Sequence, residues 1–241
     1  MLTIFIPSRY ESVDFLRALK GTRKSRIGDA PVFTGEFGGK PARIAICGMG
    51  QVHCARRIAA VLEATAPLNE TEPVWLVGFG GGLDPSLKRL DIVYLLGNAP
   101  GAEAPILAAS AALPAVQTRR AEKIYTSEVV VDTEEKKNAA FLATGAPIVD
   151  METGPFLELL TKHGRTGAVI RVISDDVSEE FPADLIGWSH DFERGRDTPV
   201  RLAWYLLTHP ADLVRMRRFL APLPNARRRL LEFVTAAATS I

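Results

Sequence analysis

Two carboxylates stand at the end of a short apolar run in the segment Ile148-Val149-Asp150-Met151-Glu152-Thr153. The run follows the turn Thr144-Gly145-Ala146-Pro147 and is typical of a short buried strand. After Thr153 the apolar residues take helical spacing, and this pattern ends near His163-Gly164. Glu152 is therefore expected where a buried strand gives way to a helix, which is a common position for functional side chains in α/β sheets.

A glutamate at this position can serve chemistry or local structure. Its two oxygens can accept hydrogen bonds side by side, which suits the vicinal hydroxyl groups of a ribose. Met151, next to it, would offer an apolar surface to the sugar ring. The simpler alternative is that Asp150 and Glu152 only stabilise the N-terminus of the following helix through its dipole. This segment alone leaves both interpretations open.

Two further apolar runs end in residues that could share a site with Glu152. Pro73–Phe79 leads into Gly80-Gly81-Gly82, and Ala168–Ile173 leads into Ser174-Asp175-Asp176. The glycines are predicted to form a loop whose free backbone N–H groups line an anion or the edge of a base, or else a plain turn. A glycine-lined wall, a diol-binding carboxylate and a second carboxylate are the parts needed to hold a nucleoside and cleave its N-glycosidic bond.

The second carboxylate would act on the departing base. Cleavage of the bond leaves electron density on a purine and makes the sugar oxocarbenium-like, after which water or phosphate takes the anomeric carbon. An acid at purine N7 accelerates this step, typically by about 10²–10⁴-fold. An aspartate partly buried after Ile173 can hold a proton near neutral pH, so Asp175 is the predicted acid. Asp176 replaces it if the register differs by one residue.

Composition limits the class of protein. The chain has 241 residues, 47% hydrophobic and 24% charged, which predicts a single α/β domain with one large core. A net charge of +1 argues against general nucleic-acid binding, because no overall positive field gathers phosphates. Cys47 and Cys54 lie in apolar surroundings and are expected to be reduced core residues of a cytoplasmic protein. Neither a signal peptide nor a transmembrane helix is expected.

The elements that must position these residues can be outlined from the apolar pattern. Helices are predicted at Tyr10–Leu19, at Ala55–Ala64 after the tight turn Gly48–His53, and at Glu134–Ala143, which Thr133 caps. Gly21–Asp29 and Gly97–Pro114 are predicted to be loops, and Ile124–Val131 is a β-branched segment. Strands are predicted at Leu2–Ile6, Val32–Phe37, Ala42–Cys47, Pro73–Phe79, Asp91–Leu96, Ile148–Val149 and Ala168–Ile173.

The last part of the chain has a different character. Val177–Asp197 is polar and is predicted to be a loop that folds over a pocket, and Pro199–Val234 reads as two or three helices broken at Pro210 and Pro222-Leu223-Pro224. One interpretation is a basic amphipathic surface for an anionic membrane or partner. In the other, the helices pack on the body through Leu202, Trp204, Leu206, Leu213, Phe219 and Leu230. The arginines, which would then lie in solvent, are Arg201, Arg215, Arg217, Arg218, Arg227, Arg228 and Arg229.

Four motifs together resemble the nucleoside phosphorylase and methylthioadenosine/S-adenosylhomocysteine nucleosidase superfamily. Each motif is modest alone, but the set occurs in the right order and spacing between Leu2 and about Asp176. The segments that look like the glycine turn, the base-site and anion-site loop, the ribose motif and the purine motif are Gly48–Val52, Gly78–Leu83, Val149–Glu152 and Ile173–Asp175.

The resemblance implies an α/β fold: a three-layer α/β/α sandwich with a central twisted mixed sheet and a C-terminal helical extension. A single domain over residues 1–241 would comprise a core (1–176), a loop (177–197) and a basic helical extension (198–241). Members of the superfamily usually assemble into homo-oligomers, which implies a dimer, trimer or hexamer. The resemblance implies no metal and no cofactor, with inorganic phosphate as the co-substrate if the enzyme is a phosphorylase.

The resemblance also assigns roles within the site. Glu152 would bind the ribose hydroxyls, Met151 would pack against the sugar, and Asp175 would protonate or hydrogen-bond the purine. The other residues expected around the ribose and base are Phe79, Gly80, Gly81, Val149 and Ser174.

Two positions depart from the pattern of the superfamily. Its nucleosidases activate water with a glutamate at the start of the first helix, where this chain aligns Ser12, so the adjacent Glu11 is the candidate. Phe79 replaces a hydroxyl residue of the glycine loop. Phosphorylases need cations around phosphate, for which Ser8 and Arg9 are the candidates and Arg26, Arg43 or Arg56 the alternatives. Hydrolysis, phosphorolysis and nucleoside binding without catalysis all stay open.

The basic tail after Glu179–Asp184 is similar to bacterial hopanoid-associated phosphorylases, which are thought to remove adenine from an adenosyl lipid. An amphiphilic substrate would give the arginine-rich helices a use, because each basic side chain near an anionic membrane contributes about 1 kcal/mol. The resemblance thus implies a purine nucleoside substrate, with a role in hopanoid biosynthesis and peripheral membrane contact as the more specific expectations.

Overall fold

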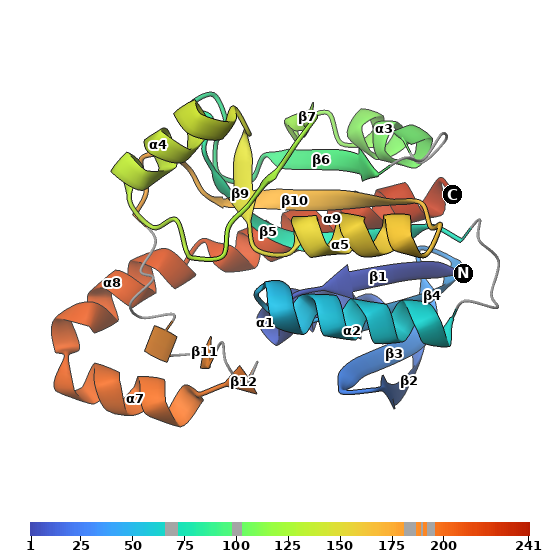
Figure 1. Ribbon diagram of the computed structural model, residues 1–241, viewed down its shortest axis with the longest axis horizontal. Helices are drawn as coiled ribbons and strands as arrows, with labels where there is room; N and C mark the ends of the chain where they lie inside the picture. The colour runs from blue at the N-terminus through green and yellow to red at the C-terminus, as the bar shows by residue number, and fades with distance from the viewer. Residues whose placement is uncertain (66–71, 98–102, 181–186, 189, 192–195) are drawn as a thin grey trace.

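A mixed β-sheet forms the centre of the molecule (Figure 1). The computed structural model describes all residues except 66–71, 98–102, 181–186, 189 and 192–195. Within the described residues, ten strands join in one sheet with the order β2-β3-β4-β1-β5-β10-β6-β7, while β9 pairs with β5 and β8 pairs with β9. The strands are β1 Leu2–Ile6, β2 Lys20–Ile27, β3 Ala30–Phe37, β4 Lys40–Ile46, β5 Val74–Gly82, β6 Ile92–Gly97, β7 Thr118–Arg120, β8 Tyr125–Thr126, β9 Ile148–Asp150 and β10 Gly167–Asp175.

Helices cover both faces of this sheet. Side chains of α1 (Arg9–Ala18), α3 (Glu103–Ala112) and α9 (Leu223–Thr239) share one buried cluster with the sheet, and those of α2 (Gln51–Ala64) and α5 (Thr153–Lys162) share the other. The two clusters lie on opposite faces of the sheet, because alternate side chains of a strand point to opposite faces, as β1 illustrates. Ile4 belongs to the first cluster and Phe5 to the second. The predicted three-layer α/β/α arrangement is confirmed.

Two segments predicted to be loops form regular structure. Gly21–Asp29 contributes to β2, which pairs with β3 at the edge of the sheet and is exposed along most of its length. An exposed edge strand carries charged residues instead of an apolar alternation, so the pattern contained no strand signal. Gly97–Pro114 contains α3, which packs against α9 through Ile106 and Ala109. Its alanine-rich composition is compatible with a helix, and the flanking glycines and prolines outweighed it in the sequence pattern.

Two other boundaries also differ from the prediction. The β-branched segment Ile124–Val131 pairs only at Tyr125–Thr126, where β8 runs parallel to β9. Thr133 does cap the next helix, α4 (Glu134–Thr144), by accepting a hydrogen bond from the backbone N–H of Lys136. Cys47 and Cys54 are free and buried, as expected.

In the part of the chain after β10 that the structure describes, the predicted prolines separate α7 (Pro199–Thr208), α8 (Pro210–Leu220) and α9. Before them, β11 (His190–Asp191) and β12 (Arg196–Asp197) pair in a separate small sheet, while much of the predicted loop 177–197 lies outside the described residues. Helix α9 is part of the hydrophobic core, because its residues Leu230, Phe233 and Val234 are fully buried against the sheet. Among the helices that the structure describes, none has the length and apolar character needed to cross a bilayer.

Candidate active site

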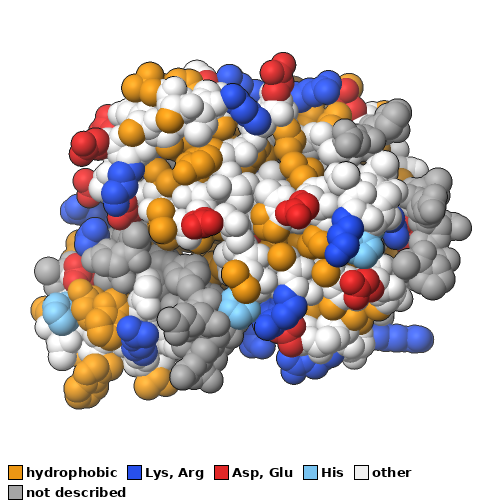
Figure 2. Space-filling model, in the orientation of Figure 1, with side chains coloured by type: hydrophobic (Ala, Val, Ile, Leu, Met, Phe, Trp, Pro, Cys, Tyr) orange, Lys and Arg blue, Asp and Glu red, His pale blue; other side chains and the backbone are white. Residues whose placement is uncertain are grey.

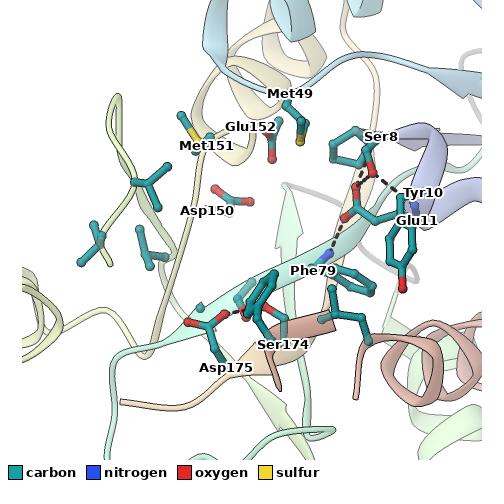
Figure 3. A pocket seen from close by; sticks show the side chains of 18 of the residues that line it. Ser8, Tyr10, Glu11, Met49, Phe79, Asp150, Met151, Glu152, Ser174 and Asp175 are labelled. Carbon is teal, nitrogen blue, oxygen red and sulfur yellow. Dashed lines mark hydrogen bonds between the residues drawn. The ribbon is translucent and has the colours of Figure 1, made fainter. Parts of the chain in front are cut away.

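A cavity of about 410 Å³ lies at the carboxyl ends of β1, β5 and β10 (Figure 3). Parallel neighbours in a sheet bring the residues that follow them to one edge, and the N-termini of α1 and α5 begin there too. Most of the predicted site residues line this cavity: Ser8, Glu11, Phe79, Gly80, Gly81, Val149, Met151, Glu152, Ser174 and Asp175. The strand ends identified from the sequence therefore meet in space.

Glu11 lies in the cavity wall at the first turn of α1 and is buried. Its Oε2 accepts hydrogen bonds from the backbone N–H of Ser8 at 3.0 Å and from the Ser8 hydroxyl at 2.6 Å. Its Oε1 accepts one from the backbone N–H of Phe79 at 2.7 Å, so one lone pair remains on Oε1. Burial raises the pKa of Glu11, and the hydrogen bonds from Ser8 and Phe79 oppose it.

Glu11, and not Ser12, is therefore the residue of this turn that reaches the cavity. The Ser12 hydroxyl turns back and donates to the carbonyl oxygen of Arg9. Glu11 also forms a capping box with Ser8, so it has a structural role at the helix N-terminus as well. The carboxylate of this turn that lines the cavity is thus Glu11, and its role in activating water stays a prediction.

Glu152 stands at the N-terminus of α5 with its carboxylate buried. Oε1 accepts a hydrogen bond from the backbone N–H of Gly50 at 3.0 Å, and Oε2 accepts one from Nη2 of Arg171 at 3.2 Å. Each oxygen keeps one lone pair, so Glu152 retains two adjacent acceptors. Burial raises the pKa of Glu152 to about 7, with Arg171 opposing and Asp150 adding to the rise.

The helix-capping alternative applies to Asp150 instead. Its Oδ1 accepts a hydrogen bond from the backbone N–H of Thr153 at 3.2 Å, and its Oδ2 accepts one from the Thr153 hydroxyl at 2.5 Å. Glu152 makes no such bond to the helix backbone. The two carboxylates of this segment share Arg171 but differ in their other partners, and Glu152 is the one that keeps an acceptor on each of its oxygens.

Arg171, in the middle of β10, joins these carboxylates and was not predicted. It is fully buried, donates from Nε to Oδ2 of Asp150 at 2.8 Å, and donates from Nη2 to both Asp150 and Glu152. Burial alone would lower the pKa of Arg171, but Asp150, Glu152 and Glu11 together raise it. An arginine inside the apolar run Ala168–Ile173 is a visible signal, since a buried charge needs a buried partner.

Gly78 makes room for this cluster. A methyl group at this position would lie 2.5 Å from Nη1 of Arg171 and 2.7 Å from Oε1 of Glu11. Nη1 of Arg171 and Oε1 of Glu11 therefore both lie close to the position that a methyl group on Gly78 would take, next to the β5 backbone. Nη1 has no hydrogen-bond partner within the described residues.

Ser174 and Asp175 both face the cavity although they are adjacent in β10. The pairing of β10 with β5 shifts register between Ile173 and Asp175, and a bulge of this kind can turn consecutive side chains to one side of a strand. The Ser174 hydroxyl donates to Oδ1 of Asp175 at 2.6 Å. Asp176 lies outside the cavity lining, and its carboxylate accepts hydrogen bonds from Ser178. The register chosen from the sequence therefore places Asp175 in the site.

Lys137 of α4 is the partner of Asp175, and it was not predicted from the sequence. Its side chain is fully buried, and Nζ donates to Oδ2 of Asp175 at 2.6 Å. The surrounding residues, Glu134-Glu135-Lys136-Lys137-Asn138, read as an ordinary exposed helix face. Asp175 is thus paired with a buried ammonium, a neighbour that the sequence did not predict.

The three glycines predicted to form a loop belong to β5 instead. Gly80 pairs with Ile173 of β10, and Gly81 and Gly82 pair with Val149 and Ile148 of β9, so they are strand residues. A methyl group on Gly81 would lie 3.2 Å from the Val149 side chain. These glycines therefore let strands approach closely at the site, and the sequence could not distinguish this from a loop.

The candidates for phosphate binding are only partly brought to the site. Ser8 lines the cavity, whereas Arg9 is exposed and does not line it. Arg43 is buried and donates to the Thr3 hydroxyl, and Arg56 pairs with Asp29. Arg26 is exposed. None of the predicted arginines lines the cavity, and Arg171, which pairs with Glu152, is fully buried and does not line it either.

The remaining wall of the cavity is apolar and was also missed. Helices α7, α8 and α9 contribute Leu202, Met216, Phe219, Leu220 and Leu223. Val129, Val130 and Val131, which precede α4, face them across the cavity lining together with Met49 and Pro7. Several of these positions appeared only as part of an amphipathic tail, and the sequence pattern could not show that they would meet the carboxylates.

Solved structures of nucleosidases share this fold. Neither a protein-family profile nor a curated protein matches the sequence. The 5'-methylthioadenosine/S-adenosylhomocysteine nucleosidase from Neisseria meningitidis, in complex with methylthio-immucillin-A, is 15% identical with a TM-score of 0.71 over 100% of this chain and 99% of its own. The futalosine hydrolase of Helicobacter pylori is 16% identical with a TM-score of 0.73 over 100% and 97%. A nucleosidase from S. pneumoniae is 14% identical with a TM-score of 0.71 over 99% and 98%. The chain thus has the fold of the nucleoside phosphorylase and nucleosidase superfamily.

Proposed function

We propose that this protein is an enzyme that cleaves the N-glycosidic bond of a purine nucleoside and releases the free base. The observation that carries the proposal is the convergence of Glu11, Glu152 and Asp175 in one cavity at the carboxyl ends of the strands. The nucleosidase fold and the ligand-bound nucleosidase structures support a small-molecule nucleoside substrate.

Glu152 would bind the ribose. The lone pair left on each of its oxygens can accept a hydrogen bond from one of the two vicinal hydroxyls. Arg171 would hold the carboxylate in place and supply a positive charge beneath it. Met151 and Phe79, which line the same cavity, would pack against the sugar and the base.

Glu11 would activate the nucleophile. Its raised pKa suits a general base, and the lone pair on Oε1 is available to take a proton from water. Arg171 would act on Glu11 through its charge, because its side chain is fully buried and does not line the cavity. A phosphate needs cationic partners, and none of the described residues that line the cavity is a lysine or an arginine, so we propose hydrolysis.

Asp175 would meet the base at N7, the atom that gains electron density as the bond breaks. It lies in the cavity lining apart from Glu11 and Glu152, as expected if Asp175 contacts the base and the two glutamates act at the sugar (Figure 3). The separation allows a purine nucleoside to bridge the two carboxylate sites.

The apolar wall would receive an apolar group at the 5′ position of the ribose. Leu202, Met216 and Phe219 form it without a charged side chain among them. A cavity of about 410 Å³ lies within the range of about 300–1,000 Å³ that is usual for small-molecule sites. The most specific form of this proposal is an adenosyl-hopanoid, in which the lipid supplies the apolar 5′ group.

Helices α7 and α8 would bring such a substrate from an anionic membrane. Val200, Trp204 and Leu207 repeat at helical spacing on α7 with 82%, 70% and 78% of their surfaces exposed, and Figure 2 shows hydrophobic side chains at this corner of the molecule. Between residues 199 and 220 there are four arginines and one aspartate, so the charge complements anionic lipid. The opposite sides of these helices line the cavity through Leu202 and Met216.

One assay tests the reaction. The protein is incubated with adenosine, inosine, methylthioadenosine and an adenosine with a long alkyl 5′ substituent, each with and without phosphate, and free base is measured. Release without phosphate means hydrolysis, and release only with phosphate means phosphorolysis. Binding without release of base from any of them would refute an enzyme and leave a nucleoside-binding protein. Size-exclusion chromatography tests the expected homo-oligomer.

A sedimentation assay tests the membrane contact. Co-sedimentation is expected with vesicles that contain phosphatidylglycerol but not with pure phosphatidylcholine, and it should weaken in Trp204→Ala and in the double variant Arg217→Glu/Arg218→Glu. The matched control is Arg23→Glu/Lys24→Glu on the exposed edge strand β2. Equal losses in the control, or no sedimentation at all, would refute the contact. Loss of an oligomer in Trp204→Ala would assign the surface to a second copy instead.

A further inference from the structure

Lys137 is an ammonium group enclosed by three acceptors. Besides Oδ2 of Asp175, it donates to the backbone carbonyl oxygens of Asp176 and Glu179, both at 2.7 Å. An ammonium has three N–H donors, so all of them are used. A buried charge is retained only where its partners compensate for lost hydration, and here the compensation comes from a carboxylate that lines the cavity.

This enclosure determines what Asp175 can offer to a ligand. Oδ2 accepts from Lys137, and Oδ1 accepts from the Ser174 hydroxyl at 2.6 Å. Both neighbours are donors, so the carboxylate is held as an acceptor through both oxygens. Each oxygen keeps a lone pair. A ligand that reaches Asp175 therefore has to present N–H or O–H donors, and an acceptor atom placed there would face negative charge.

Purine bases differ at the edge concerned. Adenine carries an exocyclic amino donor next to N7, whereas the 6-oxo purines carry a carbonyl acceptor there. An amino group can donate to the carboxylate at once, and N7 can donate as well once it has taken up a proton in the course of bond cleavage. A 6-oxo base would place its carbonyl oxygen against the carboxylate.

We propose that Lys137 is a positioning residue that fixes Asp175 as a hydrogen-bond acceptor and thereby makes the site selective for 6-aminopurine over 6-oxopurine bases. The inference rests on the proposed function, because it assigns Asp175 to the base. A purely structural role for Lys137 would be to fasten the turn after β10 through Asp176 and Glu179. A purely structural role would affect the binding of both bases alike. The ratio of the affinities for the two bases therefore distinguishes a structural role of Lys137 from a role in selectivity.

The experiment is a calorimetric titration of the intact protein with adenine and with hypoxanthine. The wild type should bind adenine about 10- to 100-fold more tightly, the ratio that a hydrogen bond to a charged group contributes. In Lys137→Gln the uncharged neighbour lets Asp175 bind a proton and donate it to a carbonyl, so the ratio should fall towards one. Lys137→Arg keeps the charge and should keep the preference. Lys136→Gln, at an exposed residue paired with Asp132, is the control and should match the wild type.

The outcomes are distinguishable. A wild type that binds neither base contradicts the proposed function and this inference together. Binding of both bases without preference, or an unchanged ratio in a folded Lys137→Gln, overturns the inference alone. Thermal unfolding followed by circular dichroism shows whether the variants fold. If Lys137→Gln does not fold, the test rests on the wild-type affinity ratio and on Lys137→Arg. Loss of the adenine preference in a folded Lys137→Arg would contradict the role of the charge.

Discussion

Substitution of the buried Glu152 by glutamine should raise the free energy of unfolding and lower the rate of nucleoside cleavage. Burial raises the pKa of Glu152 from 4.5 to about 7, which corresponds to about 3 kcal/mol of unfavourable free energy for keeping it ionised in the folded protein. Between these two pH values the folded state binds more protons than the unfolded state. The free energy of unfolding therefore falls as pH rises from about 4.5 through 7, and the cost is complete above that range.

Glu152→Gln removes this cost. The variant should match the wild type in stability near pH 4.5 and exceed it above pH 7, by up to about 3 kcal/mol. Arg171 stays compensated in the variant, because Asp150 accepts from its Nε and Nη2. Activity should change in the opposite direction, because a neutral amide loses charge-assisted hydrogen bonds to the ribose worth about 1.5–3 kcal/mol. Cleavage of nucleosides should slow by about one to two orders of magnitude.

Urea unfolding at pH 5 and pH 8, together with kcat/KM, measures both effects. The control is Glu158→Gln, an exposed glutamate on the same helix, α5, which should change neither quantity. A difference in stability between Glu152→Gln and the wild type that is the same at the two pH values would refute the assigned cost of burial. An unchanged rate would remove Glu152 from the ribose site.

The other predictions concern the two ends of the cavity. Gly78→Ala should lower both stability and activity, because its methyl group would displace Arg171 and Glu11, whereas Gly187→Ala, where a methyl group meets nothing within 4 Å, should be neutral in unfolding and rate assays. The pH profile of kcat/KM should rise with pH through the raised pKa of Glu11, since only its ionised form accepts a proton, and Glu11→Gln should abolish that limb of the profile. Asp175→Asn should slow cleavage of adenosine far more than that of a nitrophenyl riboside, whose leaving group has no N7 or amino group from which Asp175 could accept a hydrogen bond, and Asp176→Asn should spare both. Equal losses on the two substrates would indicate a folding defect instead.

The sequence predicted those parts of the site that follow from buried strands. Apolar runs marked β1, β5 and β10, and the carboxyl ends of parallel strands share an edge, so the sequence already brought Glu11 and Asp175 to one side of the sheet. Glu152 follows β9, which pairs antiparallel with the end of β5, so its place in the cavity did not follow from this rule. The edge strand β2 was missed because it buries little surface, and the alanine-rich helix α3 was missed because glycines and prolines flank it. Both errors concern elements remote from the carboxylates, and the site did not depend on them.

What the sequence could not show is how each carboxylate is compensated. Arg171 was visible as a charge inside an apolar run, yet only the fold shows that it lies between Asp150 and Glu152. Lys137 was not visible at all, since its helix carries charges on several sides and only tertiary packing buries this one. The consequence is chemical: a carboxylate beside an arginine and another carboxylate can bind a diol, whereas a carboxylate fixed by an ammonium and a hydroxyl can only accept. The residue types came from the sequence, but the protonation states that decide their chemistry came from neighbours brought in by the fold.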